Sequence, residues 1–294
     1  MFIFRLIPNI SDEFLTAYRL ATILSQKTLV GISPVPSSNS MPLFDPDFLS
    51  IFSNDVSPTS TSIWCGLPNG YLATSEENLA YITEWRENIY YYNTLNIMDK
   101  YWIMSDPEFP YPFLPEPITE SKGIFLYALP SIRRNIWDTI EAWMISESQE
   151  PLKIFAPFQD PYIYKKKISD LREKHKSQKK CFLTTPNVFS PEDLNKEIAK
   201  SKYILDIFNY KGISYPSVIA NASGIPSICG DNVFPEGSII VSADSREKCK
   251  DGGRLTGEIY SVYNIDNIAN ALSMLDFEED IIYDNTSAIF DIFI

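Results

Sequence analysis

Residues 211–228 read KGISYPSVIANASGIPSI and place a glycine and a proline toward each end of a short apolar stretch. Pro216 suits the first turn of a helix, and Gly224 suits the position just beyond its end. Residues 225–229 are short and apolar enough for a buried strand. The stretch therefore predicts a strand end, a turn, a short helix and a strand. Such a turn lies at a helix N-terminus, where unpaired amides and the helix dipole favour an anion.

Outward from this stretch, the chain after residue 120 alternates between apolar strand candidates and helix candidates. The predicted strands span residues 123–129, 152–158, 181–185, 203–208 and 238–242, and the predicted helices span residues 133–146, 164–180, 190–201 and 265–275. This rhythm predicts a doubly wound, mostly parallel sheet with right-handed crossovers. Ligands bind at the carboxyl ends of the strands in such sheets, and the turn before Pro216 follows one of those ends.

The first 105 residues show a similar but less regular order. The predicted strands here span residues 2–7, 28–33, 62–67 and 99–105, and the predicted helices span residues 11–26 and 76–93. Only four of the eleven glycines precede residue 200, so the two halves of the chain have different compositions. Residues 106–120 hold five prolines, which exclude a helix or a central strand and indicate a stiff connection. We therefore expect two domains, residues 1–117 and 118–294.

Composition and charge limit the class of protein. A formal charge of −13 with a pI near 4.6 argues against general nucleic-acid binding, which needs clustered lysine and arginine. The basic segment 164–180 has apolar residues at helical spacing and is interpreted as a solvated helix face. Four cysteines without metal-ligand spacing fit a reducing compartment. Without a transmembrane-length apolar run or signal-peptide features, a cytoplasmic location is the expectation.

Residues 96–275 resemble the retaining GT-B glycosyltransferases of the group 1 type. The matching segments are residues 95–105, residues 125–143 and the opening stretch, in which the family pattern is met by Gly212, Pro216, Ala220, Ala222, Ser223, Gly224 and Pro226. The resemblance implies an α/β fold of two Rossmann-like domains, here with a shortened N-terminal domain on the acceptor side. It also implies that the C-terminal domain holds a nucleotide diphosphate sugar as donor, and that neither a cofactor nor a metal is required.

The resemblance also assigns candidate site residues. The catalytic candidates are Arg134, Lys211 and Glu236, and the donor-binding candidates are Arg134, Gly212, Ser214, Tyr215, Pro216, Ser217 and Asn232. A guanidinium forks onto phosphate oxygens, so cations and helix-end amides could stabilise a leaving diphosphate without a protein nucleophile. Acceptor-side candidates are Ser105 and Asp106, together with an aromatic platform of Tyr81, Trp85, Tyr90 and Tyr91, which equally fits a buried core stripe.

The chain departs from the family pattern where the chemistry is expected. Lys211 and Ile219 stand where the family has two glutamates, and Leu129 stands at the position of a phosphate-binding arginine. The single histidine, His175, lies in the basic segment and is given no role. Arg134 and Lys211 are also compatible with ordinary surface cations. Two of the site candidates also have a purely structural explanation, because the residue pairs Asp231-Asn232 and Glu236-Gly237 are typical of turns.

The sequence therefore favours an enzyme that moves a hexose from a nucleotide diphosphate sugar to an acceptor, with retention of configuration. The acceptor is a glycan, a lipid or a protein that the residues do not identify. The alternative is a non-catalytic GT-B-like protein that keeps the scaffold for binding or assembly after losing both glutamates. A nucleotide-sugar epimerase is disfavoured, because it needs acid–base carboxylates and a histidine in the site.

Overall fold

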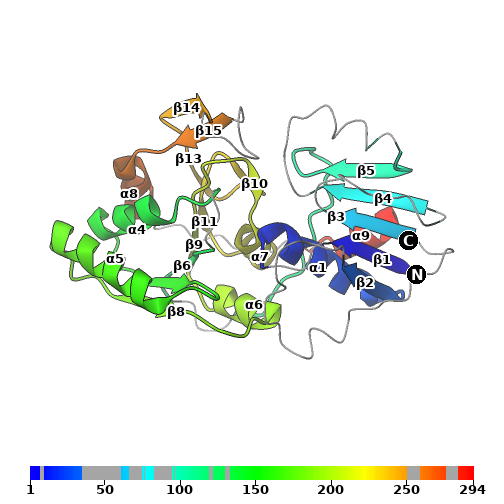
Figure 1. Cartoon of the computed structure of the whole chain (residues 1–294), viewed down its shortest axis with the longest axis horizontal. Helices are drawn as coiled ribbons and strands as arrows, with labels where there is room; N and C mark the ends of the chain where they lie inside the picture. Colours follow the sequence, from blue (N-terminus) through cyan, green and yellow to red (C-terminus); the bar gives the residue numbers. More distant parts are fainter. Residues whose placement is uncertain are drawn as a thin grey trace. The chain divides into compact units, whose positions relative to one another are not determined.

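A computed structural model gives the fold of the chain. It describes residues 1–6, 10–34, 61–65, 75, 77–82, 95, 97–118, 122–129, 133–249, 259–275 and 284–294. The chain divides into two compact units (Figure 1): unit 1 comprises Met1–Leu114 and Asp284–Ile294, and unit 2 comprises Pro115–Tyr283. Within the described ranges, every helix is too short or too polar to cross a bilayer.

Unit 1 is built on a parallel sheet. Its described strands are β1 (Phe2–Leu6), β2 (Val30–Pro34), β3 (Thr61–Cys65), β4 (Glu77–Ile82) and β5 (Lys100–Ile103), in the order β2-β1-β3-β4-β5. Helix α1 (Asp12–Ser25) begins at Ser11, whose hydroxyl accepts a hydrogen bond from the amide of Phe14 at 3.2 Å. The predicted first strand, first helix and second strand are thereby confirmed.

The predicted helix at 76–93 is wrong over its first part, because β4 lies there and pairs with β3 and β5. A central parallel strand is covered on both faces, so its sequence is a continuous apolar run without alternating polar residues. Leu79, Ala80, Tyr81 and Ile82 are accordingly all buried. The Tyr81 hydroxyl donates to the carbonyl of Pro110 at 3.1 Å, which places this aromatic in the core. Trp85, Tyr90 and Tyr91 lie outside the described residues.

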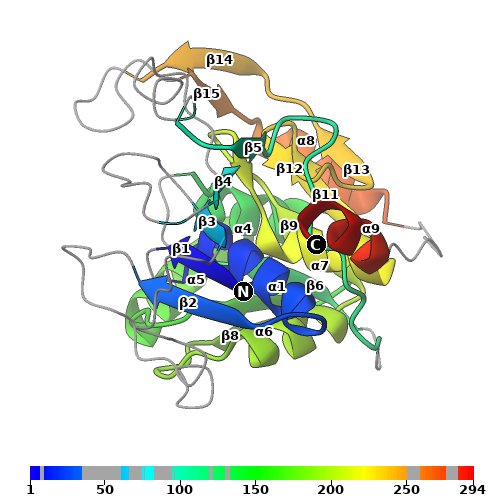
Figure 2. The same cartoon turned by 90° about the vertical axis from the view of Figure 1, so that its right-hand side faces the viewer.

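The C-terminal helix α9 (Thr286–Phe293) belongs to unit 1 and lies beside α1 (Figure 2). Ile289, Phe290 and Phe293 are buried, and the Phe293 ring lies 4.7 Å from that of Trp102. The predicted domain boundary at 117/118 therefore differs in two ways from the division of the chain into units 1 and 2. Unit 2 begins three residues earlier, after Leu114, and residues 284–294 return to unit 1 instead of closing the C-terminal domain.

Asn285 holds this returning segment, and its removal is expected to destabilise unit 1 by about 1–3 kcal/mol, because two hydrogen bonds to the backbone are lost and the two backbone groups keep only the bond between them. Its side chain donates to the carbonyl of Tyr111 at 2.8 Å and accepts from the amide of Phe113 at 3.1 Å. Hydrogen exchange of the Phe113 amide in Asn285→Ala, with urea unfolding, measures the loss. Asn267→Ala, which removes an exposed amide in unit 2, is the control. Equal protection in both variants would contradict the anchoring role.

Unit 2 is built on a second parallel sheet. Its described strands are β6 (Ile124–Tyr127), β7 (Leu152–Phe155), β8 (Cys181–Thr184), β9 (Tyr203–Asp206), β11 (Ser227–Gly230) and β13 (Ile239–Val241), in the order β13-β11-β9-β6-β7-β8. The helices are α4 (Ile136–Ile145), α5 (Pro161–His175), α6 (Pro191–Ala199), α7 (Tyr215–Ser223) and α8 (Ile265–Ser273). The predicted β/α alternation of this half is confirmed.

Helices α4, α5 and α8 cover one face of this sheet, where they share a core with β6, β7, β9, β11 and β13 (Figure 1). Trp143 of α4 is fully buried in that core, and its indole N–H donates to the carbonyl of Glu150 at 3.0 Å. Helices α6 and α7 pack together, and α7 contacts β9 and β11. This second group of helices and the strand ends beside it hold the candidate site residues.

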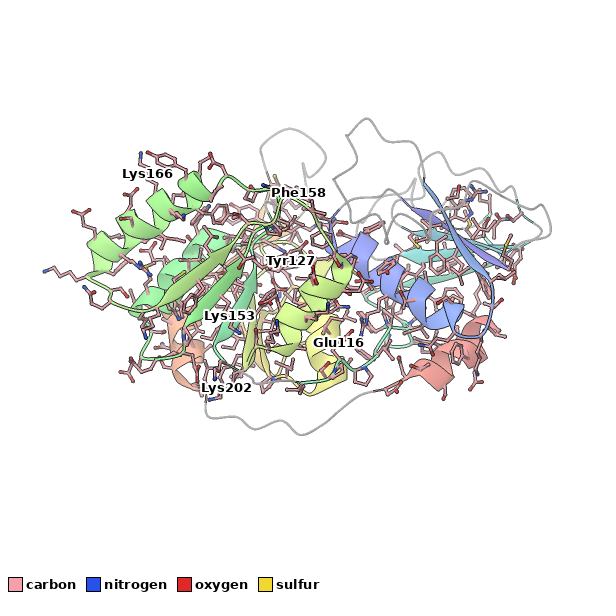
Figure 3. All side chains as sticks on the ribbon, turned by 90° about the horizontal axis from the view of Figure 1, so that it is seen from below. Glu116, Tyr127, Lys153, Phe158, Lys166 and Lys202 are labelled. Atoms are coloured by element: carbon pink, nitrogen blue, oxygen red, sulfur yellow. The ribbon has the colours of Figure 1, made fainter. Side chains whose placement is uncertain are left out.

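The basic segment is a solvated helix face, as predicted. Figure 3 shows Lys166 on the outer side of α5. His175 lies 2.7 Å from the carboxylate of Glu141 on α4. Hydrogen bonding to Lys174, reinforced by His175, outweighs burial and lowers the pKa of Glu141. The histidine therefore ties two helices together on the surface.

Two small additions were not predicted from the sequence. Strands β10 (Gly212–Ile213) and β12 (Val233–Phe234) form a short parallel pair, and β14 (Ser245–Lys248) and β15 (Ile259–Val262) form an antiparallel one. Strand β14 is exposed throughout and has no apolar alternation to reveal it. Asp231, which follows β11, accepts from the Tyr263 hydroxyl at 2.7 Å and from Arg246 at 2.9 Å. These bonds tie the hairpin to the sheet.

Candidate functional site

The candidate site lies at the carboxyl edge of the unit 2 sheet. The chain moves from β6 to β7 and β8 on one side and later returns to β9 on the other side of β6. The direction of strand addition therefore reverses between β6 and β9, and ligands bind outside the strand ends at such a point. Residues 133–134 and 207–217 follow these two strands, so most of the candidates named from the sequence lie at this edge.

Arg134 is not open to a ligand, which corrects the interpretation from the sequence. Its guanidinium donates to the carboxylate of Asp206, and both side chains are 2% exposed. The rings of Tyr127 and Phe208 lie 5.0 and 4.7 Å from the guanidinium carbon. A buried carboxylate at the end of β9 thus neutralises the cation, and the two rings enclose it. A diphosphate would have to displace Asp206 to reach Arg134.

The N-terminus of α7 is capped by the chain itself. The Ser214 hydroxyl accepts from the amide of Ser217 at 3.1 Å and donates to the carboxylate of Asp206. The Ser214 amide donates to the carbonyl of Phe234 at 2.8 Å, which continues the β10–β12 pairing. The amides of Ser214 and Ser217 were predicted to be unpaired and are not. Pro216 is buried in the first turn and carries no N–H.

Tyr215 faces the interior and not the strand ends. Its ring is fully buried, and its hydroxyl donates to the side chain of Asn195 on α6 at 2.7 Å. The Asn195 amide in turn donates to the carboxylate of Glu116 at 3.2 Å, at the start of unit 2 (Figure 3). Tyr215 therefore holds α7 against α6 and the entering chain.

The Ser214 cap is expected to contribute more stability than an ordinary one. Ser214→Ala should cost about 2 kcal/mol, at the upper end for a cap, because the hydroxyl also serves the buried carboxylate of Asp206. Ser190→Ala provides the matched control, since Ser190 caps α6 in the same way, accepting from Asp193 at 3.3 Å on the surface. Its cost should be about 1 kcal/mol. Urea unfolding measures both, and equal losses would contradict the added role of Ser214.

Arg133 is a functional candidate that the sequence interpretation missed. Arg134 forms an isolated antiparallel bridge with Phe208, whereas Arg133 lies in the turn before it. Arg133 is accordingly only half-buried. A methyl group added at Gly212 would lie 3.5 Å from its Cδ and 3.2 Å from the Phe208 ring. Lys211, the residue before Gly212, is exposed. The Arg133 side chain therefore packs at Gly212, next to Lys211 in the chain, and the Arg-Arg doublet was the sequence signal for it.

Asn232 and Glu236 occupy different environments. Asn232 is 4% exposed, and its side-chain amide donates to the carbonyls of Asn209 at 2.9 Å and Phe208 at 3.3 Å. It therefore holds the loop after β9. Glu236 is exposed, and its backbone carbonyl accepts from Asn221 of α7 at 3.3 Å. Its carboxylate belongs to the solvent-facing surface of the loop.

The positions that depart from the family pattern are interior. Ile219 is fully buried in α7 and Leu129 is 8% exposed, so neither position presents a polar group. Burial raises the pKa of the Cys229 thiol to about 12, which makes this neighbour of Ser217 a poor nucleophile. Over the described part of the chain, no three His, Cys, Asp or Glu side chains come together as a metal site.

No protein-family model matches the chain, and no curated protein matches it in sequence. Solved structures do match in fold. An apo structure of OtsA is 8% identical with a TM-score of 0.53, covering 94% of this chain and 92% of that one. WaaG, a glycosyltransferase involved in lipopolysaccharide biosynthesis, is 9% identical with a TM-score of 0.51, covering 93% and 90%. Sucrose-phosphate synthase from Thermosynechococcus elongatus is 10% identical with a TM-score of 0.51, covering 94% and 90%.

Each of these likenesses extends over nearly the whole of both chains, through both parallel sheets. At such low identity they establish architecture and not chemistry. The chain therefore has the GT-B fold, with two Rossmann-like units that are each built on a parallel sheet, and this confirms the fold that the sequence resemblance implied.

Proposed function

We propose that this protein is a glycosyltransferase that moves a hexose from a nucleotide diphosphate sugar to an acceptor, with retention of configuration. The observation that supports it is that Arg133 packs at Gly212, next to Lys211 in the chain, at the edge where the strand order of unit 2 reverses. Cations at that edge suit the diphosphate of a donor. The GT-B fold supports the same class of ligand by analogy.

In the proposed mechanism the cations stabilise the charge that develops on the leaving diphosphate. The Arg133 guanidinium forks onto two phosphate oxygens, and the Lys211 ammonium contributes a point charge. Transfer through an oxocarbenium-like state then needs no protein nucleophile: the bond from the anomeric carbon to the phosphate oxygen breaks, the acceptor oxygen bonds to that carbon on the same face, and its proton passes to the departing phosphate oxygen. Glu236 is the nearby carboxylate available to a sugar hydroxyl. Arg134 becomes a positioning residue, because its pair with Asp206 holds the backbone that presents Arg133.

Turnover of the donor tests this proposal directly. The intact chain is incubated with UDP-, GDP- and ADP-sugars, and released nucleoside diphosphate is followed with and without candidate glycan, lipid and protein acceptors. At least one donor is expected to be consumed faster than in buffer, with the anomeric configuration of the product retained by NMR. Binding of a donor without release of nucleoside diphosphate would reject the enzyme and favour the second candidate.

The second candidate is a non-catalytic binding or assembly protein on the GT-B scaffold. The observation that favours it is the network of Asp206, Arg134 and Ser214, in which the Arg134 guanidinium and the Ser217 amide, both predicted to receive phosphate, bind to groups of the protein itself. The buried Ile219, at the position of a family glutamate, points the same way. Such a protein would show no turnover of any donor, whether or not a nucleotide binds to it.

A further inference from the structure

Phe158 has a backbone conformation that its side chain does not favour. Residues 156–159 form a turn closed by the Gln159 amide, which donates to the carbonyl of Ala156 at 3.3 Å. Pro157 is its second residue, and Phe158, the third, has a φ of 58°. That is the pattern of a type II turn, whose third position favours glycine. A phenylalanine there is strained, and strain of this kind is concentrated at ligand sites.

This turn is fixed at the same edge of the sheet as the candidate site. The Phe158 amide donates to the carbonyl of Pro186 at 3.0 Å, and the Ala156 amide donates to the carbonyl of Thr184 at 2.8 Å. These bonds hold the turn beyond the carboxyl ends of β7 and β8. Figure 3 shows Phe158 past the strand ends and Tyr127 inside the unit. The Phe158 ring is partly exposed and stacks on no other aromatic ring of the described residues.

The strand order relates this turn to the two loops that carry Arg133 and Lys211. Arg133 and Lys211 follow β6 and β9, and the order of strands is β9-β6-β7-β8. Neighbouring strands lie about 4.8 Å apart, so the ends of β9 and β7 are separated by roughly 10 Å. That separation is comparable with the span from the diphosphate to the base of an extended nucleotide.

We propose that Phe158 is the stacking platform for the base of the donor nucleotide. The inference rests on the proposed function to the extent that a nucleotide must bind, but it does not require turnover. Stacking on an aromatic ring tolerates any base, because every base presents a π face. The stacking role of the ring then explains why a phenylalanine stands at a position where the turn favours glycine.

Calorimetric titration of the intact chain with UDP, GDP, ADP and inorganic pyrophosphate tests this role. Phe158→Leu removes the ring and should weaken the nucleotide that binds best about tenfold, whereas Phe158→Tyr should bind as the parent does. Pyrophosphate has no base, so Phe158→Leu should not change its affinity. Phe182→Leu is the matched control, since Phe182 is 55% exposed on β8 before the strand end. It should leave every affinity unchanged.

Phe158→Gly separates binding from folding. Glycine adopts a positive φ without steric cost, so this variant should melt at a higher temperature than the parent while binding nucleotide as weakly as Phe158→Leu. A lower melting temperature, or equal nucleotide affinity in Phe158→Leu and the parent, would overturn the stacking role and leave the proposed function standing. If none of the three nucleotides binds the parent chain, the proposed function is overturned and this inference with it.

Discussion

Asp206→Ala is expected to destabilise unit 2 by about 3–5 kcal/mol, because it leaves the Arg134 guanidinium buried without its counter-charge. The partner carboxylate is 2% exposed, so water cannot replace it. The same substitution removes the acceptor of the Ser214 hydroxyl, which caps α7. The loss of stability should therefore appear first as faster hydrogen exchange at the end of β9 and in the first turn of α7. Hydrogen exchange of those amides, with urea unfolding of the whole chain, measures it.

Two further variants show that the loss comes from an uncompensated charge. Replacing both partners, as Arg134→Met with Asp206→Leu, should recover much of the stability, since no buried charge remains. Lys196→Gln serves as the surface control, because the Lys196–Asp193 pair is more than 60% exposed on each side. It should change the free energy of unfolding by less than about 1 kcal/mol. A double variant no more stable than Asp206→Ala would refute the buried-charge explanation.

The β/α order of unit 2 could be predicted because its signals are local. Strands such as β6 and β9 are short apolar runs, and α6 begins with a serine and a proline that act within one turn. The opening stretch was recognisable for the same reason, since Gly224 ends α7 with a φ of 68°. Each feature depends on residues that are close in the chain.

The incorrect interpretations concern partners that are distant in the chain. The acidic residue of the buried pair lies 72 residues from Arg134, so sequence reasoning took the arginine as available for phosphate. The sequence of residues 284–294 does not show that α9 packs in unit 1, because an apolar helix face does not identify the element against which it packs. Strand β4 was read as a helix because a strand buried on both faces lacks the alternation of period two.

Arg133→Met is expected to weaken binding of nucleoside diphosphate about 10- to 100-fold, since hydrogen bonds to a charged group contribute about 1.5–3 kcal/mol each. The adjacent arginine provides an internal control of the same size and charge. Arg134→Met should instead lower the stability of unit 2 by about 3–5 kcal/mol, because Asp206 is then buried and unpaired. The half-buried Arg133 should change the free energy of unfolding by about 1 kcal/mol or less.

Calorimetric titration with the best-binding nucleotide and urea unfolding of both variants separate the two roles. Arg133→Lys keeps the charge but not the fork, so its affinity should fall between those of the parent and Arg133→Met. Lys211→Met should weaken binding as well, because Lys211 is the exposed residue before Gly212, where the Arg133 side chain packs. If Arg133→Met bound nucleotide like the parent while Arg134→Met lost affinity at unchanged stability, Arg134 would have to exchange the carboxylate of Asp206 for phosphate. The buried pair would then be part of the donor site, and the cluster of Arg133 and Lys211 would lose its role.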